Sequence, residues 1–172
     1  PHNHQDMSSV LQLAERIMFD LRLMQPAAWI YWQAVEDETA QNNWGWIHAN
    51  FVTGEARYDV TKQYYAMGQF SKFIRPGSRI IPTGDGRSVA AYHERDGTLA
   101  VVIRNERSIA VQATYDLTAF SYPAVRAEVY ETSESKNMEP SVLELASNGF
   151  AVEVPPKSVI TVVIRDVKWR RD

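Results

Sequence analysis

Apolar positions recur with a helical period near the start of the chain. They follow one another at intervals of three or four residues, with polar and charged residues between them: Val10, Leu13, Ala14, Ile17 and Leu21. This pattern predicts an amphipathic helix with one buried face. Ser8 or Ser9 is the expected N-cap. The helix must end before Pro26, because proline disfavours helical geometry in the residue that precedes it.

A short and almost wholly apolar run follows that proline. The run Ala28–Gln33 is rich in aromatic and β-branched residues, which is typical of a strand covered on both faces in a parallel sheet. A helix, a short loop and a buried strand together indicate an αβ unit. Side chains alternate along a strand, so Ala28, Ile30 and Trp32 should face one side of the sheet. Trp29 and Tyr31 should face the other side.

A polar and aromatic stretch without a period, running from Glu36 to Trp46, predicts a long loop. Thr61 can then cap a second helix. Bulky apolar groups fall along one broad face of it: Tyr64, Met67, Phe70, Phe73 and Ile74. The run 75–77 (Arg-Pro-Gly) should end this helix, since proline interrupts helical hydrogen bonding and Pro-Gly favours a tight turn.

The period changes from helical to two beyond Arg79. Asp96-Gly97 between two apolar runs is a hairpin signal, with strands expected over 89–94 and 99–105. Further short strands are predicted over 110–116, 125–131, 143–145, 150–154 and 158–165, with a turn at 147–149. Many short antiparallel strands indicate a β-sandwich. The tail from Lys168 is expected to be frayed.

These patterns predict two structural units of class α/β plus all-β, with residues 1–75 in the first and 76–172 in the second. One strand and two helices cannot close a hydrophobic core, and a two-sided apolar strand needs neighbours. The missing sheet partners are expected either upstream in the same protein or on another chain.

Composition excludes some classes of function. The net charge of -3 argues against nucleic acid as a partner, because nucleic-acid binding needs a basic field. No run approaches the ~20 apolar residues of a membrane span. The absence of cysteine suits either the cytoplasm or a cysteine-poor secreted enzyme. His2 and His4 could in principle bind a metal, but without further ligands a mobile polar end is expected, and we predict neither a metal nor a cofactor.

The run Ala28–Gln33, followed by Lys62–Ser78 with its Phe-Ser-Lys-Phe-Ile-Arg-Pro-Gly segment, resembles the end of the catalytic barrel in glycoside hydrolase family 30. Pro155-Pro156-Lys157 before the final strand is a further likeness. The family includes glucocerebrosidases, glucuronoxylanases, β-1,6-glucanases and β-1,6-galactanases.

The resemblance implies the last strand and flanking helices of a (β/α)8 barrel followed by an antiparallel β-sandwich. It also implies retaining hydrolysis of a β-linked polysaccharide or glycoconjugate by two glutamates, both expected upstream of Pro1, so that the chain alone should be inactive. The upstream part of the barrel is then an expected partner, and an extracellular or cell-surface location is expected.

Two neighbouring carboxylates of this chain, Glu36 and Asp37, fall where a barrel enzyme could use them. Glu36 and Asp37 come just after the predicted barrel strand, where such barrels place catalytic groups. Retaining glycosidases hold two carboxyl groups ~5 Å apart across the scissile bond. Neighbours in a loop rarely face one substrate atom, so we expect Glu36 and Asp37 to be solvated loop acids.

Three residues are predicted to bind substrate: Trp32, Trp46 and Asn50. Trp32 would lie nearest the barrel rim, where a flat indole can stack on a sugar ring, and the alternative is an aromatic cap on the barrel. Trp44, Trp46 and Asn50 belong to the following loop, in which core packing is expected for at least one tryptophan. Two other functions stay open for the chain: a non-catalytic carbohydrate-binding module and a structural β-sandwich module.

Overall fold

A computed structural model describes residues 6–39, 44–52, 54 and 56–170 of the chain. The first half holds α1 (Met7–Phe19), which continues as the π-helix η1 (Asp20–Met24), and α2 (Lys62–Ser71). Between them lie three short strands, β1 (Val35–Asp37), β2 (Ile47–Ala49) and β3 (Tyr58–Val60). The second half contributes β4 (Arg79–Ile81), β5 (Ser88–His93), β6 (Thr98–Asn105), β7 (Val111–Asp116), β8 (Phe120–Ser121), β9 (Arg126–Thr132), β10 (Asn137–Glu144), β11 (Gly149–Val154), β12 (Ser158–Ile164) and β13 (Lys168–Trp169).

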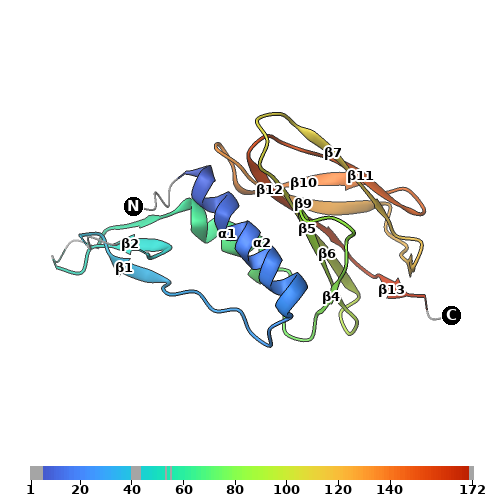
Figure 1. The fold of residues 1–172 in the computed structure, drawn as a ribbon, viewed down its shortest axis with the longest axis horizontal. Coiled ribbons are helices and arrows are strands. Elements are labelled where there is room, and N and C mark those ends of the chain that lie inside the picture. Colours follow the sequence, from blue (N-terminus) through green and yellow to red (C-terminus); the bar gives the residue numbers. More distant parts are fainter. Residues whose placement is uncertain (1–5, 40–43, 53, 55, 171–172) are drawn as a thin grey trace.

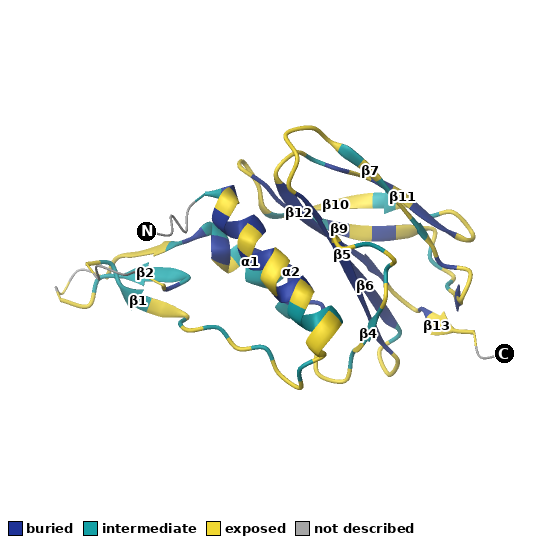
Figure 2. Cartoon of the chain, viewed as in Figure 1, coloured by how far each residue is buried: buried dark blue, intermediate teal, exposed yellow. Residues whose placement is uncertain are grey.

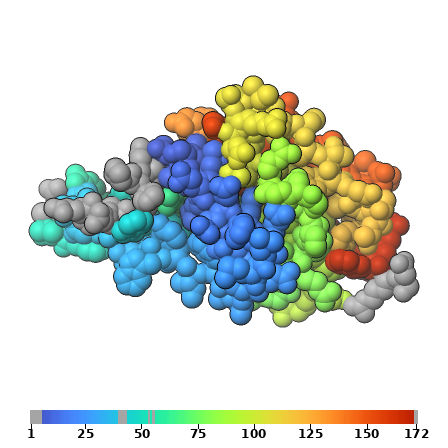
Figure 3. Space-filling model, viewed as in Figure 1, coloured from blue at the N-terminus to red at the C-terminus, as the bar shows by residue number. Residues whose placement is uncertain are grey.

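A six-stranded antiparallel sheet forms the centre of the molecule. Its strand order is β10-β9-β12-β6-β5-β4. Helices α1 and α2 lie against one face, and the paired strands β7 and β11 lie across the other (Figure 1). The small sheet β1-β2-β3 extends beyond the helices at the far end from β7 and β11 (Figure 3).

The central strands are buried on both faces. Every residue of β5, β6 and β12 is buried, and these strands form the dark band in Figure 2. Val101 and Val162 pack toward β7 and β11, whereas Val102 and Val159 pack against the helices. The alternation of a strand therefore places apolar groups in two separate cores, which explains why these strands read as almost continuous hydrophobic runs.

Both helices occur where the periodicity predicts them, with corrected ends. The N-cap of α1 is Asp6 rather than Ser8 or Ser9, because the Asp6 carboxylate accepts from the Ser9 amide at 2.9 Å and from the Ser8 hydroxyl at 2.7 Å. The helical segment ends at Gln25, which adopts a left-handed conformation (φ 46°) before the proline.

The predicted hairpin and most predicted strands of the second half are confirmed. Strands β5 and β6 pair around the Asp96-Gly97 turn, and Gly97 has φ 59°. Gly149 is the last residue of the predicted turn at 147–149, with φ 156°, and a Cβ there would lie 2.1 Å from the Tyr115 carbonyl oxygen, so only glycine fits. Strand β10 is longer than expected; it is an edge strand whose irregular register near Met138 hides the two-residue period.

Residues 28–33 are not part of a sheet among the described residues, because no other described segment pairs with them as a neighbouring strand. The barrel strand expected there, with neighbours from outside this chain, therefore stays a prediction. Two other expectations from the sequence are wrong. The stretch predicted as a loop begins within β1, at Glu36 and Asp37, and ends directly before β2; at three residues each, these strands are too short to carry a period. Lys168 and Trp169 are not frayed: they pair with β8, and the Trp169 ring packs on Phe120.

A buried polar network joins α2 to the central sheet. The Thr161 hydroxyl lies 3.0 Å from the backbone oxygen and 2.5 Å from the side-chain oxygen of Gln69. The Gln69 amide donates in turn to the Thr132 hydroxyl at 2.8 Å. All three side chains are fully buried, so each hydrogen bond replaces one that water would otherwise supply.

Loss of this network should destabilise the whole fold. Thr161→Val keeps the side-chain volume but removes the single hydroxyl donor that the two Gln69 oxygens share, so we expect a loss of about 1–3 kcal/mol in the free energy of unfolding. Urea denaturation measures it. Thr161→Ser is the matched control and should stay closer to the wild type. Equal stabilities of the Val and Ser variants would show that the network contributes nothing.

Candidate functional site

The extended segment 28–33 presents two different faces. Trp29 and Tyr31 are half-buried and pack against the cluster formed by α1, α2 and the sheet. Ile30 and Trp32 point away from the helices and are 87% and 78% exposed. The two classes alternate along the segment in Figure 2, as the sequence predicts for Ile30 and Trp32 on one side and Trp29 and Tyr31 on the other.

Side-chain hydrogen bonds and ring contacts hold the buried face in place. The Trp29 indole N–H donates to the Asp20 carboxylate at 2.9 Å, and the Tyr31 hydroxyl donates to the Gln63 side-chain oxygen at 3.4 Å. The two rings stack with centroids 6.3 Å apart. Burial, together with the nearby Glu36 carboxylate, raises the pKa of Tyr31 above its ordinary value. The segment is thus fixed by α1, η1 and α2.

Trp46 lies on the packed side rather than beside the exposed indole. Its ring stacks on Tyr31 with centroids 4.8 Å apart and an interplanar angle of 17°. Its indole N–H is buried and has no hydrogen-bond partner among the described residues. The arrangement brings Trp46 together with Tyr31 and Trp29 in one aromatic stack, while the ring of Trp32 stays in solvent.

Asn50 follows directly on β2. Its side-chain oxygen accepts from the Val52 backbone amide at 3.0 Å, and the backbone N–H of Asn50 donates to the Arg57 carbonyl at 3.0 Å. Phe51 and Val52 are exposed. Asn50 therefore shapes a turn that presents apolar side chains to solvent, a feature that the sequence pattern had not indicated.

The two neighbouring carboxylates hold the loop. Glu36 accepts from the amides of Trp44 and Gly45, the latter at 2.9 Å. Asp37 accepts from the Thr39 amide at 2.8 Å and the Thr39 hydroxyl at 2.5 Å. These bonds lower the pKa of Asp37, the hydroxyl being the larger cause. As adjacent residues of β1 they alternate in direction, so the pair does not face one substrate atom.

Large exposed hydrophobic side chains gather in the first part of the chain. Of fifteen among the described residues, eleven lie between Phe19 and Tyr64. A folded chain normally covers such groups, and apolar surface of this extent marks an interaction site. The central sheet is covered by helices on one face and by β7 and β11 on the other. The outer side of segment 28–33, with Ile30 and Trp32, has no such cover among the described residues.

Other chemistry is sparse among the described residues. They contain no group of three or more acidic, histidine or cysteine side chains that could hold a metal ion. His2 and His4 lie outside the described residues. No described helix is long and apolar enough to cross a membrane.

Comparisons with known proteins place this geometry in context. No family model matches the sequence. An endo-β-1,6-galactanase of Hypocrea rufa is 30% identical over 107 residues, which cover 60% of this chain and 20% of that protein. The glucuronoxylanase XynC of Bacillus subtilis (strain 168) is 30% identical over 135 residues, covering 76% of this chain and 31% of the relative. The chain thus spans between a fifth and a third of the relatives it matches.

A solved structure shares the fold over almost the whole chain. The GH30 endoxylanase from Clostridium papyrosolvens C71 superposes with a TM-score of 0.70 at 21% identity. The match covers 96% of this chain and 40% of that enzyme. The helices, the extended segment and the sheets therefore recur together as one part of a larger protein.

The pKa of Asp37 gives a direct check on the loop geometry. Thr39→Ala removes the hydroxyl donor, so the pKa of Asp37 should rise toward 3.8. The pKa of Asp37 is lower in the folded chain than in the unfolded chain. Its hydrogen bonds therefore stabilise the fold at pH values above the unfolded pKa, and this stabilisation is lost as the pH falls through the folded pKa. An NMR titration of the carboxyl carbons measures this shift.

Asp116 and Thr118 form a comparison pair for Asp37 and Thr39, because the Thr118 backbone amide donates to the Asp116 carboxylate at 2.7 Å. There the amide is the larger cause of the lowered pKa of Asp116. Thr118→Ala should therefore shift Asp116 less than Thr39→Ala shifts Asp37. An unchanged pKa of Asp37 in the Thr39→Ala variant would contradict the hydrogen bond from the Thr39 hydroxyl as the main cause of the lowered pKa.

Proposed function

We propose that this chain, which matches the C-terminal part of family 30 glycoside hydrolases in sequence and fold, completes a retaining hydrolase of β-linked polysaccharides. In this proposal residues 1–75 supply the last strand and flanking helices of the (β/α)8 barrel. Residues 76–172 form the attached β-sandwich. The chain contributes one wall of the sugar pocket and a rigid support for it, and the proposed substrates are β-1,6-galactan and β-1,6-glucan.

The two-faced segment 28–33 is the observation that carries this proposal. A barrel strand has one face toward the surrounding helices and one toward the barrel interior, with sheet neighbours on both sides. Trp29 and Tyr31 already contact the helices. Ile30 and Trp32 are solvent-exposed, and the backbone has no sheet partner among the described residues. The upstream part of the barrel would supply both the neighbours and the cover.

Trp32 is the residue we propose for contact with sugar. It follows the segment's other apolar groups toward the C-terminal end, where (β/α)8 enzymes bind their substrates. A flat, exposed indole can stack on the apolar face of a sugar ring. Asn50 and Trp46 would border the same pocket, Asn50 through the turn that it shapes and Trp46 by supporting Tyr31 from behind.

The chain supplies no catalytic carboxylate in this scheme. Glu36 and Asp37 are engaged by loop amides and by Thr39, so neither serves as nucleophile or as acid/base. The two glutamates are proposed to lie upstream. A polysaccharide cannot cross a membrane, so the enzyme would act outside the cell or at its surface.

A structural role for the sheets is the second candidate function. The network of Gln69, Thr132 and Thr161 and the ammonium group of Lys62 both tie α2 to the sheet. Lys62 donates to the Ser133 carbonyl at 2.7 Å and to the Asn137 side-chain oxygen at 2.8 Å. Such contacts suit a support that fixes the last barrel helix. A free carbohydrate-binding module would not require them.

The isolated chain should hydrolyse no glycoside. We expect the purified 172 residues to release no nitrophenol from aryl β-glycosides, whereas the full-length protein that contains them should do so. Circular dichroism and a cooperative melting transition would establish that the isolated chain is folded. Turnover by the chain with no other polypeptide present would refute the proposed division of labour.

Replacement of Trp32 tests the pocket wall. In the full-length protein, Trp32→Ala should lower kcat/KM for an oligosaccharide by roughly tenfold or more, because a ring contact worth ~1 kcal/mol and its buried area are lost. Trp32→Tyr should retain part of the activity. Trp169→Ala, in strand β13, is the matched tryptophan control. Equal activity of the wild type and Trp32→Ala would remove this residue from the site.

A further inference from the structure

A cavity of about 370 Å³ opens beside strand β13, at the opposite end of the molecule from β1 (Figure 1). The residues that line it are Gly77, Arg79, Tyr92, Glu94 and Trp169. Pockets that bind small molecules have volumes of roughly 300–1,000 Å³, so this cavity has room for a small ligand. It belongs to the sheets of the second half and lies apart from segment 28–33.

Trp169 supplies an aromatic wall to this cavity. Its backbone pairs with β8, and its ring contacts Phe120 with centroids 4.9 Å apart and Tyr92 with centroids 6.0 Å apart. Tyr92 is buried, and its hydroxyl donates to the Val167 carbonyl at 3.2 Å. The indole itself remains 38% exposed. It is therefore held in place by the two rings behind it while part of its surface faces solvent, as stacking on a sugar requires.

The strand register brings two charged side chains to the same side of the sheet as Tyr92. Arg79 of β4 lies directly opposite Tyr92 of β5, and the Cβ atoms of such pairs are ~4.5–5.5 Å apart. Glu94 lies two residues beyond Tyr92, so the alternation of side chains directs it to that side as well. The guanidinium group donates hydrogen bonds and the carboxylate accepts them. The cavity thus offers hydrogen-bonding groups of both kinds, and their charges cancel.

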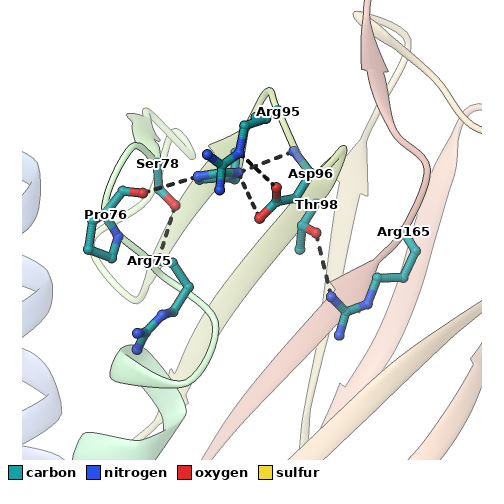
Figure 4. A network of polar contacts seen from close by, with 8 residues as sticks. Arg75, Pro76, Ser78, Arg95, Asp96, Thr98 and Arg165 are labelled. Carbon is teal, nitrogen blue, oxygen red and sulfur yellow. Dashed lines mark hydrogen bonds and ion pairs between the residues drawn. The ribbon is translucent and has the colours of Figure 1, made fainter.

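The turn that carries Gly77 is held from behind. The Arg75 backbone amide donates to the Ser78 hydroxyl at 3.2 Å, and the Pro76 carbonyl oxygen lies 3.1 Å from Nε2 of His93 (Figure 4). Gly77 has φ 95°, and a Cβ there would lie 3.0 Å from the same nitrogen of His93. Both the backbone conformation and the space therefore favour glycine, and the rim of the cavity is fixed without a ligand.

We propose that this cavity binds one pyranose ring of a neutral polysaccharide and so provides a second, non-catalytic contact for the polymer. The apolar face of the sugar stacks on Trp169, and its hydroxyl groups accept from Arg79 and donate to Glu94. One positive and one negative side chain leave no excess charge, which suits a neutral sugar. This assignment rests on the proposed action of the protein on β-1,6-linked polysaccharides. It gives the sheets a contact with substrate in addition to their role as a support.

An NMR titration of the isotopically labelled chain with a β-1,6-linked glucose tetrasaccharide tests the site. Saturable shifts are expected for the indole N–H of Trp169 and for the backbone amides of Gly77 and Glu94. Trp169→Ala and Arg79→Ala should each weaken binding roughly tenfold, as expected for the loss of a ring contact or of a hydrogen bond from a charged group. Arg79 is an exposed residue of an edge strand, so its replacement tests the site even if Trp169→Ala disturbs the packing of β13.

Arg107→Ala is the matched control for Arg79→Ala. It removes the same charge from an exposed position beyond the end of β6 and should leave the affinity unchanged. Absence of saturable shifts, shifts confined to segment 28–33, or equal weakening by Arg107→Ala would overturn the site. Tighter binding of methyl β-glucuronide than of methyl β-glucoside would overturn the assignment to a neutral sugar.

Two further outcomes separate this site from the proposed function. An oligosaccharide does not bridge the two ends of the molecule, so the contact at Trp169 should matter for the polymer alone: Arg79→Ala in the full-length protein should raise KM for β-1,6-glucan severalfold. Hydrolysis by the full-length protein without tetrasaccharide binding to the chain would remove the second contact and leave the proposed function intact. Binding at Trp169 without any hydrolysis by the full-length protein would refute the proposed function and keep the second contact.

Discussion

The central strands β5, β6 and β12 are apolar on both faces, and the rest of the structure depends on covering them. Strands β7 and β11 cover one face, and α1 and α2 cover the other. Burial of both faces is the main favourable contribution to folding. The two helices therefore belong to the same folded body as the sheets, although their sequence resembles the end of a barrel.

Specific polar contacts determine how the helices sit on this sheet. Apolar packing alone is non-directional, whereas the buried bonds of Gln69 with Thr161 and Thr132 allow one position of α2. The ammonium group of Lys62 adds a second attachment at the other end of the helix. Trp29 and Tyr31 pack on these helices, and the helices pack on the sheet. The position of the neighbouring Trp32 therefore depends on the sheet through these two contacts.

Two exposed surfaces of this chain differ in character. Around segment 28–33 the exposed groups are apolar, which suits contact with further protein and with the apolar face of a sugar. The cavity at Trp169 combines an indole with one cation and one carboxylate, which suits a neutral sugar.

The sequence by itself determined both helices, the Asp96-Gly97 hairpin, most strands of the second half and the alternation at Ile30 and Trp32, because periodicity and turn residues act locally. It missed the Asp6 cap, β1 to β3 and the pairing of Trp169, where short segments carry no period. Tertiary structure alone decides whether residues 28–33 form a strand, since a strand needs hydrogen-bonding neighbours that the described residues lack. It also brought Arg79, Tyr92 and Trp169 to one cavity, because residues far apart in sequence meet only when sheet register and strand packing are set.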